Sequence, residues 1–133
     1  MRKNILIVED DEALATLYKT ELELKGYKVA LIRNGIEAFS AIKKEKPDLV
    51  LLDIMLPGKN GLEILEEIRT SQETKDTKIV MLTNFGSEEN VSTALENGAI
   101  DYIMKYKIVP SELSEKLASL LGDATDSLIH VTN

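Results

Sequence analysis

The chain has 133 residues, 44% of them apolar, which fits one domain of ordinary size with a buried core. Its formal charge of −7, from 23 acidic and 16 basic side chains, argues against nucleic-acid binding by this segment, because phosphate backbones attract clustered Lys and Arg. Cysteine is absent, and no apolar run approaches the roughly 18 residues of a membrane helix. We therefore expect a cytoplasmic protein without a signal peptide, disulfides or membrane contact.

Five short apolar runs are spaced along the chain, with helical patterns after each of them. The runs lie at residues 5–8, 29–32, 49–52, 79–82 and 102–104. Each is continuous rather than alternating, which is typical of strands covered on both faces. Gly26 and Gly98 stand where helix ends favour a left-handed residue, and Pro110 stands near the start of the last helix.

The strand–helix alternation, repeated five times, predicts an α/β fold with a parallel sheet and helices on both faces. Right-handed crossovers leave few topologies, and the flavodoxin-like (βα)5 arrangement with strand order 2-1-3-4-5 is the common solution for five strands. We assign residues 1–121 to this domain and residues 122–133 to a linker or C-terminal tail.

Acidic and polar residues follow the carboxyl ends of four of the predicted strands. In such sheets, ligands bind at these ends where the strand order reverses, here between the first and third strands. The residues that follow the first, third, fourth and fifth strands are, in turn, Glu9 with Asp10, Asp53, Thr83 and Lys105. Because neighbouring strands lie about 4.8 Å apart, we expect Glu9, Asp10 and Asp53 to share one small cleft.

This combination of residues predicts phosphoryl transfer. Crowded carboxylates stay ionised when a hard cation neutralises them, and oxygen ligands of this kind suit Mg²⁺, which often shares its shell with phosphate oxygens. Thr83 adds a hydroxyl group and Lys105 a positive charge. Such groups around one carboxylate supply the charge compensation and positioning that the transfer requires. Asp53 would then be the nucleophile, giving an aspartyl phosphate.

Each residue also has a purely structural interpretation. Asp11 and Glu12 are better read as the cap and first turn of a helix. A single Asp at a strand end is usually a turn residue, and an aromatic such as Tyr102 in an edge strand can simply cover apolar surface. His130, the one histidine, is assigned no role. The functional interpretation therefore depends on the whole set occurring at strand ends in the right order.

From about residue 4 to residue 121 the sequence resembles the receiver domain of bacterial response regulators. The matching motifs are IVEDD at 7–11, LDIMLP at 52–57, GKNG at 58–61, MLT at 81–83 and DYIMK at 101–105. The resemblance implies that Asp53 receives a phosphoryl group from a sensor histidine kinase or a phosphotransfer protein. It implies Mg²⁺ bound by Asp10, Asp53 and the backbone carbonyl of Met55, with Glu9 acting through water.

The resemblance also implies how the signal leaves the domain. Thr83 and Lys105 would contact the phosphoryl group, and Thr83 and Tyr102 would move together as a switch. The surface formed by the last two helices and the strand between them would then regulate a target protein or an output domain, or form a phosphorylation-dependent dimer. Such a domain is a signalling module that catalyses only its own phosphorylation and dephosphorylation.

Three features depart from the family pattern. Tyr106 stands where most members have a proline after a cis bond; a non-proline cis bond costs about 2.5–4 kcal/mol, so this bond is expected to be trans or strained. Asn84 stands where the family usually has a very small residue. Met55 and Phe85 are bulky and apolar at two positions that influence how water reaches the phosphoaspartate.

Three other functions are compatible with parts of this pattern. A phosphatase of the haloacid-dehalogenase type needs a second acid two residues after its Asp nucleophile, and that position is Met55. A flavin mononucleotide carrier needs a Ser/Thr/Gly-rich phosphate loop after the first strand, where this chain has acids at 9–12. A binding module that works without phosphorylation stays open because of Tyr106 and Asn84.

Overall fold

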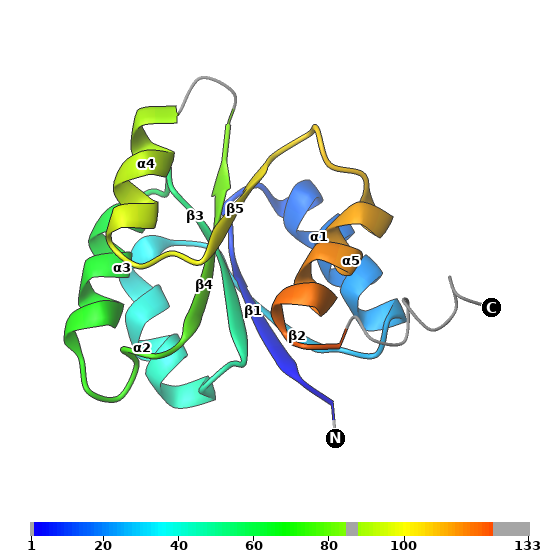
Figure 1. Ribbon diagram of the computed structural model, residues 1–133, viewed down its shortest axis with the longest axis horizontal. Coiled ribbons are helices and arrows are strands. Elements are labelled where there is room, and N and C mark those ends of the chain that lie inside the picture. Colours follow the sequence, from blue (N-terminus) through cyan, green and yellow to red (C-terminus); the bar gives the residue numbers. More distant parts are fainter. Residues whose placement is uncertain (1, 85–87, 124–133) are drawn as a thin grey trace.

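Five strands and five helices alternate along the chain in the computed structural model, which describes residues 2–84 and 88–123 (Figure 1). In chain order they are β1 (Asn4–Val8), α1 (Glu12–Leu24), β2 (Lys28–Ile32), α2 (Gly35–Glu45), β3 (Leu49–Asp53), α3 (Gly61–Thr70), β4 (Lys78–Thr83), α4 (Glu88–Glu96), β5 (Asp101–Met104) and α5 (Pro110–Leu120).

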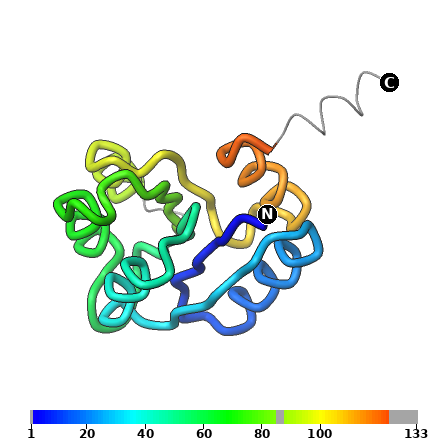
Figure 2. The backbone as a smooth tube through the Cα atoms, turned by 90° about the horizontal axis from the view of Figure 1, so that it is seen from below, coloured from blue at the N-terminus to red at the C-terminus, as the bar shows by residue number. Residues whose placement is uncertain are grey.

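All strands are parallel and lie in the order β2-β1-β3-β4-β5, so the predicted flavodoxin-like topology is confirmed. Helices α1 and α5 cover one face of the sheet, and α2, α3 and α4 cover the other, as Figures 1 and 2 show. The order reverses between β1 and β3, whose register pairs Val8 with Leu52. The residues that follow these two positions therefore meet at the carboxyl edge of the sheet.

Side chains on the two faces of the sheet and the inner faces of the helices pack into two apolar clusters, to which the three central strands contribute most of the strand residues. Every residue of β3 is buried. The prediction that all five strands are covered on both faces is wrong for β2 and β5, because these are the two edges of the sheet. Exposed residues occur there at Lys28, Ala30 and Tyr102.

Several predicted helix ends are confirmed. Asp11 caps α1, since its Oδ1 atom accepts a hydrogen bond from the Leu14 N–H at 3.1 Å. Gly26 and Gly98 follow helices with φ values of 96° and 102°, in the left-handed region that glycine tolerates. Pro110 is the first residue of α5, where a missing N–H breaks no helical hydrogen bond.

The described chain stays in contact with the domain as far as Asp123. The Asp123 carboxylate accepts hydrogen bonds from Lys3 Nζ at 2.9 Å and from the Tyr27 hydroxyl at 3.1 Å. The remainder of the predicted tail, residues 124–133 with His130, lies outside the described residues. Within the described chain, no helix is both long and apolar enough to cross a membrane.

Candidate functional site

Strands β1 and β3 bring three carboxylates together as the sequence predicts. Asp53 is the last residue of β3, and Glu9 and Asp10 directly follow β1. Each of the three offers a carboxylate oxygen, and these oxygens all lie within 4.8 Å of one another. Glu9 and Asp53 are each only 1% exposed, whereas Asp10 is exposed. We call this group the acidic cleft.

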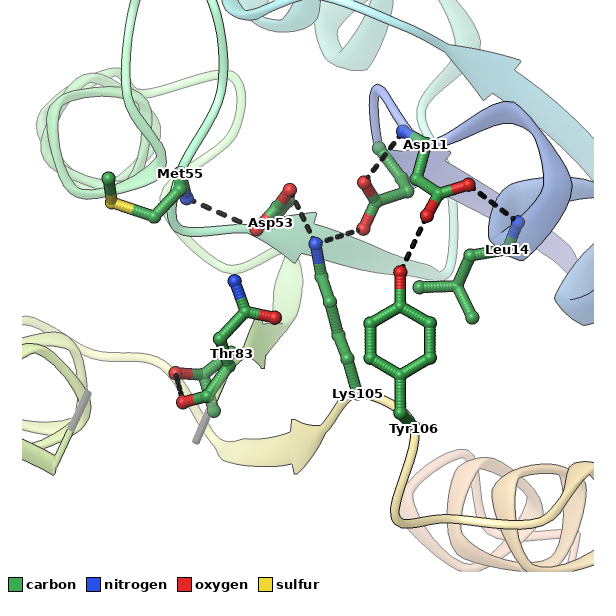
Figure 3. A network of polar contacts seen from close by, with 9 residues as sticks. Asp11, Leu14, Asp53, Met55, Thr83, Lys105 and Tyr106 are labelled. Carbon is green, nitrogen blue, oxygen red and sulfur yellow. Dashed lines mark hydrogen bonds and ion pairs between the residues drawn. The ribbon is translucent and has the colours of Figure 1, made fainter. Parts of the chain in front are cut away.

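Lys105 enters the acidic cleft from the end of β5. Its backbone N–H donates to the carbonyl of Thr83 at 2.8 Å, which ties the lysine to β4. Its Nζ atom lies 2.7 Å from Asp53 Oδ2 and 2.6 Å from Glu9 Oε1 (Figure 3). The sequence predicted the first contact but not the second, because strand order alone does not show which neighbour a long side chain will reach.

Burial dominates the electrostatics of the acidic cleft. Burial raises the pKa of Glu9 to about 7, although the hydrogen bond with Lys105 opposes this rise. Burial also raises the pKa of Asp53, again against the effect of Lys105. Burial alone would lower the pKa of Lys105, but its bonds to Asp53 and Glu9 raise that pKa above its ordinary value. The lysine therefore stays charged.

The donor set fits a hard divalent cation. Three carboxylates share the cleft with one ammonium group, so the fully ionised cluster keeps an excess of negative charge. Oxygen ligands whose negative charge is not fully neutralised suit Mg²⁺. A cation bound by Glu9, Asp10 and Asp53 would relieve the carboxylate repulsion that folding creates.

The loop after β3 is held directly against Asp53. The Met55 N–H donates to Asp53 Oδ1 at 3.1 Å, and the Gly61 N–H donates to the carbonyl of Ile54 at 2.8 Å. A Cβ atom at Gly61 would lie only 2.3 Å from the Asp53 carbonyl oxygen, so the close approach requires glycine. Asn60 caps the helix that follows, and its capping box completes the end of the loop.

A pocket of about 380 Å³ lies beside the acidic cleft. It is lined by residues of the acidic cleft, the loop after β3, and helices α3 and α4: Asp10, Ile54, Met55, Leu56, Pro57, Asn60, Leu62 and Asn90. Met55 is 61% exposed, although its backbone N–H contacts Asp53. One flank of the cleft is therefore open to molecules that approach past Met55.

Thr83 and Tyr102 lie on neighbouring strands, but their side chains have different surroundings. Thr83 is buried at the end of β4, and its hydroxyl donates to the carbonyl of Asn84 at 3.2 Å. Tyr102 is 39% exposed, and Lys116 Nζ lies 5.8 Å from its ring centroid. This arrangement places Thr83 at the edge of the cleft and Tyr102 at the surface, and their concerted movement stays a prediction.

Of the residues that depart from the family pattern, all but Phe85 lie in the described part of the chain. The Lys105–Tyr106 bond is trans, since no cis bond occurs among the described residues. Tyr106 has a φ of 65°, and its hydroxyl donates to Asp11 Oδ2 at 2.5 Å. No sequence pattern indicates this contact, because the partners are 95 residues apart. Asn84 is exposed, and Phe85 lies outside the described residues.

Sequence comparison finds many relatives of one kind. A family model described as the response regulator receiver domain matches residues 5–118. The DNA-binding response regulator MtrA of Mycobacterium tuberculosis is 40% identical over 121 residues, which are 91% of this chain and 51% of that protein. The phosphate regulon transcriptional regulatory protein PhoB of Pseudomonas aeruginosa is 40% identical over 119 residues, 90% of this chain and 52% of that protein. The chain thus spans about half the length of these relatives.

Solved structures agree with the sequence matches. The BeF3-activated N-terminal receiver domain of RstA from Klebsiella pneumoniae has a TM-score of 0.81 and 40% identity, covering 89% of this chain and 97% of that one. The receiver domain of the sensor histidine kinase PA1611 from Pseudomonas aeruginosa has a TM-score of 0.82 and 29% identity, covering 92% and 99%. In that second structure a magnesium ion is coordinated in the active site cleft.

Proposed function

Because the chain belongs to the response regulator receiver domain family, we propose that the acidic cleft is its phosphorylation site and that Asp53 is the acceptor. The observation that carries this proposal is the buried contact of 2.7 Å between Lys105 Nζ and Asp53 Oδ2. A fixed ammonium beside a carboxylate provides charge where the phosphoryl oxygens arrive. The domain would modify only itself, as a signalling module does.

In the proposed reaction, a carboxylate oxygen of Asp53 attacks the phosphorus of the donor. An oxygen–phosphorus bond forms, and the bond to the leaving group breaks with its electron pair going to that group. Lys105 then contacts the phosphoryl group that Asp53 carries. Glu9, Asp10, Asp53 and the backbone carbonyl of Met55 would hold Mg²⁺, which supplies further positive charge to the phosphoryl oxygens when it is bound.

Thr83 would turn the chemical change into a structural one. Its hydroxyl now bonds to the carbonyl of Asn84, a neutral acceptor that a charged phosphoryl oxygen can outcompete. Rotation of Thr83 toward the phosphoryl group would leave space behind it, and Tyr102 would turn inward from its exposed position. The signal would pass in this way to the surface formed by α4, β5 and α5.

The partners follow from the same role. We propose a sensor histidine kinase or a phosphotransfer protein as the donor, in the cytoplasm, where such a donor would meet the chain. The downstream partner that responds to phosphorylation is an output domain, a target protein or a second phosphorylated copy of the chain. The names of MtrA and PhoB describe DNA-binding and transcriptional regulators. These relatives therefore support a DNA-binding output domain as the downstream partner.

The proposal is tested by treating the protein with acetyl phosphate and Mg²⁺ and following its intact mass. Wild type should gain one phosphoryl group, and Asp53→Asn should gain none. Asp76→Asn, at an exposed acid outside the acidic cleft, is the matched control and should react like wild type. Hydroxylamine should remove the adduct, as it cleaves an acyl phosphate. An adduct that resists hydroxylamine, or one that forms on Asp53→Asn, would contradict the assignment.

The role of Lys105 is tested separately with Lys105→Ala. This variant should be phosphorylated about a hundredfold more slowly, the usual cost of removing one group that stabilises transition-state charge. A phosphorylated Lys105→Ala protein should also fail to show the change at α4, β5 and α5. A phosphorylation-independent binding module would instead give wild type, Asp53→Asn and Lys105→Ala the same affinity for a partner with or without acetyl phosphate.

A further inference from the structure

Tyr106 has a backbone conformation that its residue type disfavours. Residues Met104 to Lys107 form a turn in which the Lys107 N–H donates to the carbonyl of Met104 at 3.4 Å, a long hydrogen bond. Tyr106 is the third residue of this turn, and its φ is 65°. Positive φ at this place favours Gly or Asn, because a larger side chain crowds the backbone. Something other than local preference must hold the turn.

The Tyr106 side chain provides that support through its hydroxyl group. Tyr106 as a whole is 70% exposed, so little apolar burial stabilises it. Its hydroxyl donates to Asp11 Oδ2 at 2.5 Å, a bond strengthened by the charge of the carboxylate. The same carboxylate caps α1 through its other oxygen, so the partner of Tyr106 is itself fixed by a helix end.

These contacts close a ring around Lys105. The Asp11 N–H donates to Glu9 Oε2 at 2.9 Å, and Glu9 Oε1 lies 2.6 Å from Lys105 Nζ. Lys105 is joined to Tyr106 by a peptide bond, which completes the ring (Figure 3). In the same view, Tyr106 and Asp11 lie on one side of Lys105 and Met55 on the other. The Tyr106 hydroxyl thus reaches Lys105 only indirectly, through Asp11 and Glu9.

We propose that Tyr106 is a positioning residue for the phosphorylation of Asp53, a proposal that rests on the function given above. Its bond to Asp11 holds the turn after β5 in the left-handed conformation that aims Lys105 at Asp53. Tyr106 itself touches neither the acceptor nor the phosphoryl group, and acts through Lys105. A proline at this position would make the turn rigid. Here a hydrogen bond from the tyrosine to the N-cap of α1 has that effect instead.

Two substitutions at one position separate this role from others. Tyr106→Phe removes the hydroxyl but keeps the demand for positive φ, so the turn should relax and Lys105 should move. Phosphorylation by acetyl phosphate at saturating Mg²⁺ should slow roughly tenfold, since small misplacement of a catalytic group is costly. Tyr106→Gly also lacks the hydroxyl, but glycine adopts positive φ without strain. Its rate should stay within about twofold of wild type, because the turn no longer needs support.

The partner residue gives an independent test. Asp11→Ser keeps a good cap for α1 but is too short to reach the Tyr106 hydroxyl. It should slow phosphorylation as much as Tyr106→Phe, and the double variant should be no slower than either single one, because all three lose the same bond. The substitutions should lower the maximal rate of phosphorylation. They should not change the acetyl phosphate concentration that gives half of that rate. The Mg²⁺-induced rise in melting temperature should be unchanged in Tyr106→Phe.

Three results would overturn the inference: a wild-type rate for Tyr106→Phe, an equally slow Tyr106→Gly, or additive effects in the double variant. Equal slowing by Phe and Gly would show that the hydroxyl acts directly and not through the turn. Failure of the proposed function looks different, since wild type itself would then gain no phosphoryl group. A wild-type protein that reacts alongside an unimpaired Tyr106→Phe would refute the positioning role alone.

Discussion

The Nζ atom of Lys105 lies 2.7 Å from Oδ2 of Asp53, and the two side chains are only 6% and 2% exposed. The pair joins the ends of β5 and β3, which are not neighbours in the sheet. Glu9 shares the same ammonium group, and Asp10 has no such partner among the contacts of the described residues. The acidic cleft therefore holds its lysine firmly and still lacks positive charge.

Because positive charge is lacking in the acidic cleft, we predict that Mg²⁺ stabilises the folded protein. A ligand that binds only the folded chain adds about 2.7 kcal/mol to the free energy of unfolding at 100 times its dissociation constant. Thermal melts of wild type with Mg²⁺ and with a chelator should differ by several degrees. Asp10→Asn should lose most of this difference, while Glu73→Gln, at an exposed acid outside the cleft, should keep it. An unchanged difference in Asp10→Asn would put the metal at another site.

The buried carboxylates also predict how stability depends on pH without metal. Burial raises the pKa of Glu9 from 4.5 to about 7. Between these values the folded chain binds more protons than the unfolded chain, so stability is highest below about pH 4.5 for this group and falls toward pH 7. The raised pKa of Asp53 acts with the same sign. One such group changes the free energy of unfolding by at most about 1.4 kcal/mol per pH unit.

The measurement is denaturant unfolding in the presence of a chelator, at about pH 5 and about pH 7.5, on either side of most of this titration. Wild type should lose stability between the two conditions, and Glu9→Gln should lose clearly less, because a neutral amide does not titrate. Saturating Mg²⁺ should reduce the wild-type loss, since the cation favours the ionised form. Equal losses in wild type and Glu9→Gln would show that Lys105 already compensates the carboxylate.

The sequence was sufficient for the topology and the acidic cleft because both depend on strand order. Five apolar runs in a parallel sheet place the residues that follow each strand at one edge, and Glu9, Asp10 and Asp53 meet there. Coverage of β2 and β5 was predicted wrongly, since an apolar run does not reveal whether its strand is central or at an edge.

The side-chain partners at the site could not be read from the pattern. Lys105 has a flexible stem, and its second contact with Glu9 depends on the exact spacing of the four strands from β1 to β5. Tyr106 is unusual at its position in the sequence, but its bond to Asp11 needs a turn that its own residue type disfavours. The Asp11 side chain caps α1 as predicted and also accepts this second bond. Sequence patterns such as helix caps predict one contact for each residue, and they do not predict that one carboxylate accepts bonds from two segments that are distant from each other in the chain.

The contact between Gly61 and Asp53 predicts a defect from the smallest substitution. A Cβ at position 61 would lie 2.3 Å from the Asp53 carbonyl oxygen, so Gly61→Ala must displace the backbone of the acceptor or its loop. We expect a loss of roughly 1–3 kcal/mol in the free energy of unfolding, together with slower phosphorylation by acetyl phosphate.

Gly26→Ala is the control for a glycine that matters only to the fold. Gly26 has a φ of 96° and no atom within 4 Å of an added Cβ. Its substitution should cost roughly 1–2 kcal/mol through backbone strain and should leave the phosphorylation rate unchanged. Similar rates for Gly61→Ala and Gly26→Ala would mean that the loop after β3 adapts without moving Asp53.

The lifetime of the phosphoaspartate depends on how water reaches it. Hydrolysis needs a water in line with the bond between Asp53 and phosphorus, on the outer side of the phosphoryl group. Met55 lies next to this path, because its N–H bonds to Asp53 Oδ1 and its side chain lines the adjacent pocket. A thioether cannot orient a water well, so we expect slow self-hydrolysis suited to a sustained signal. From sequence alone Phe85 is assigned the same effect, although it lies outside the described residues.

Met55→Asn should shorten that lifetime, since an amide can hold the attacking water. Met55 is 61% exposed, and any backbone contact to a cation is kept, so neither folding nor metal binding should suffer. Removing acetyl phosphate and following the loss of the phosphoryl group by mass should show a rate up to about tenfold higher, equivalent to roughly 1.4 kcal/mol of barrier. Met55→Leu keeps the size and apolar character of the side chain and should decay like wild type. If Met55→Asn decays no faster than Met55→Leu, water reaches the phosphoaspartate by a path that this side chain does not control.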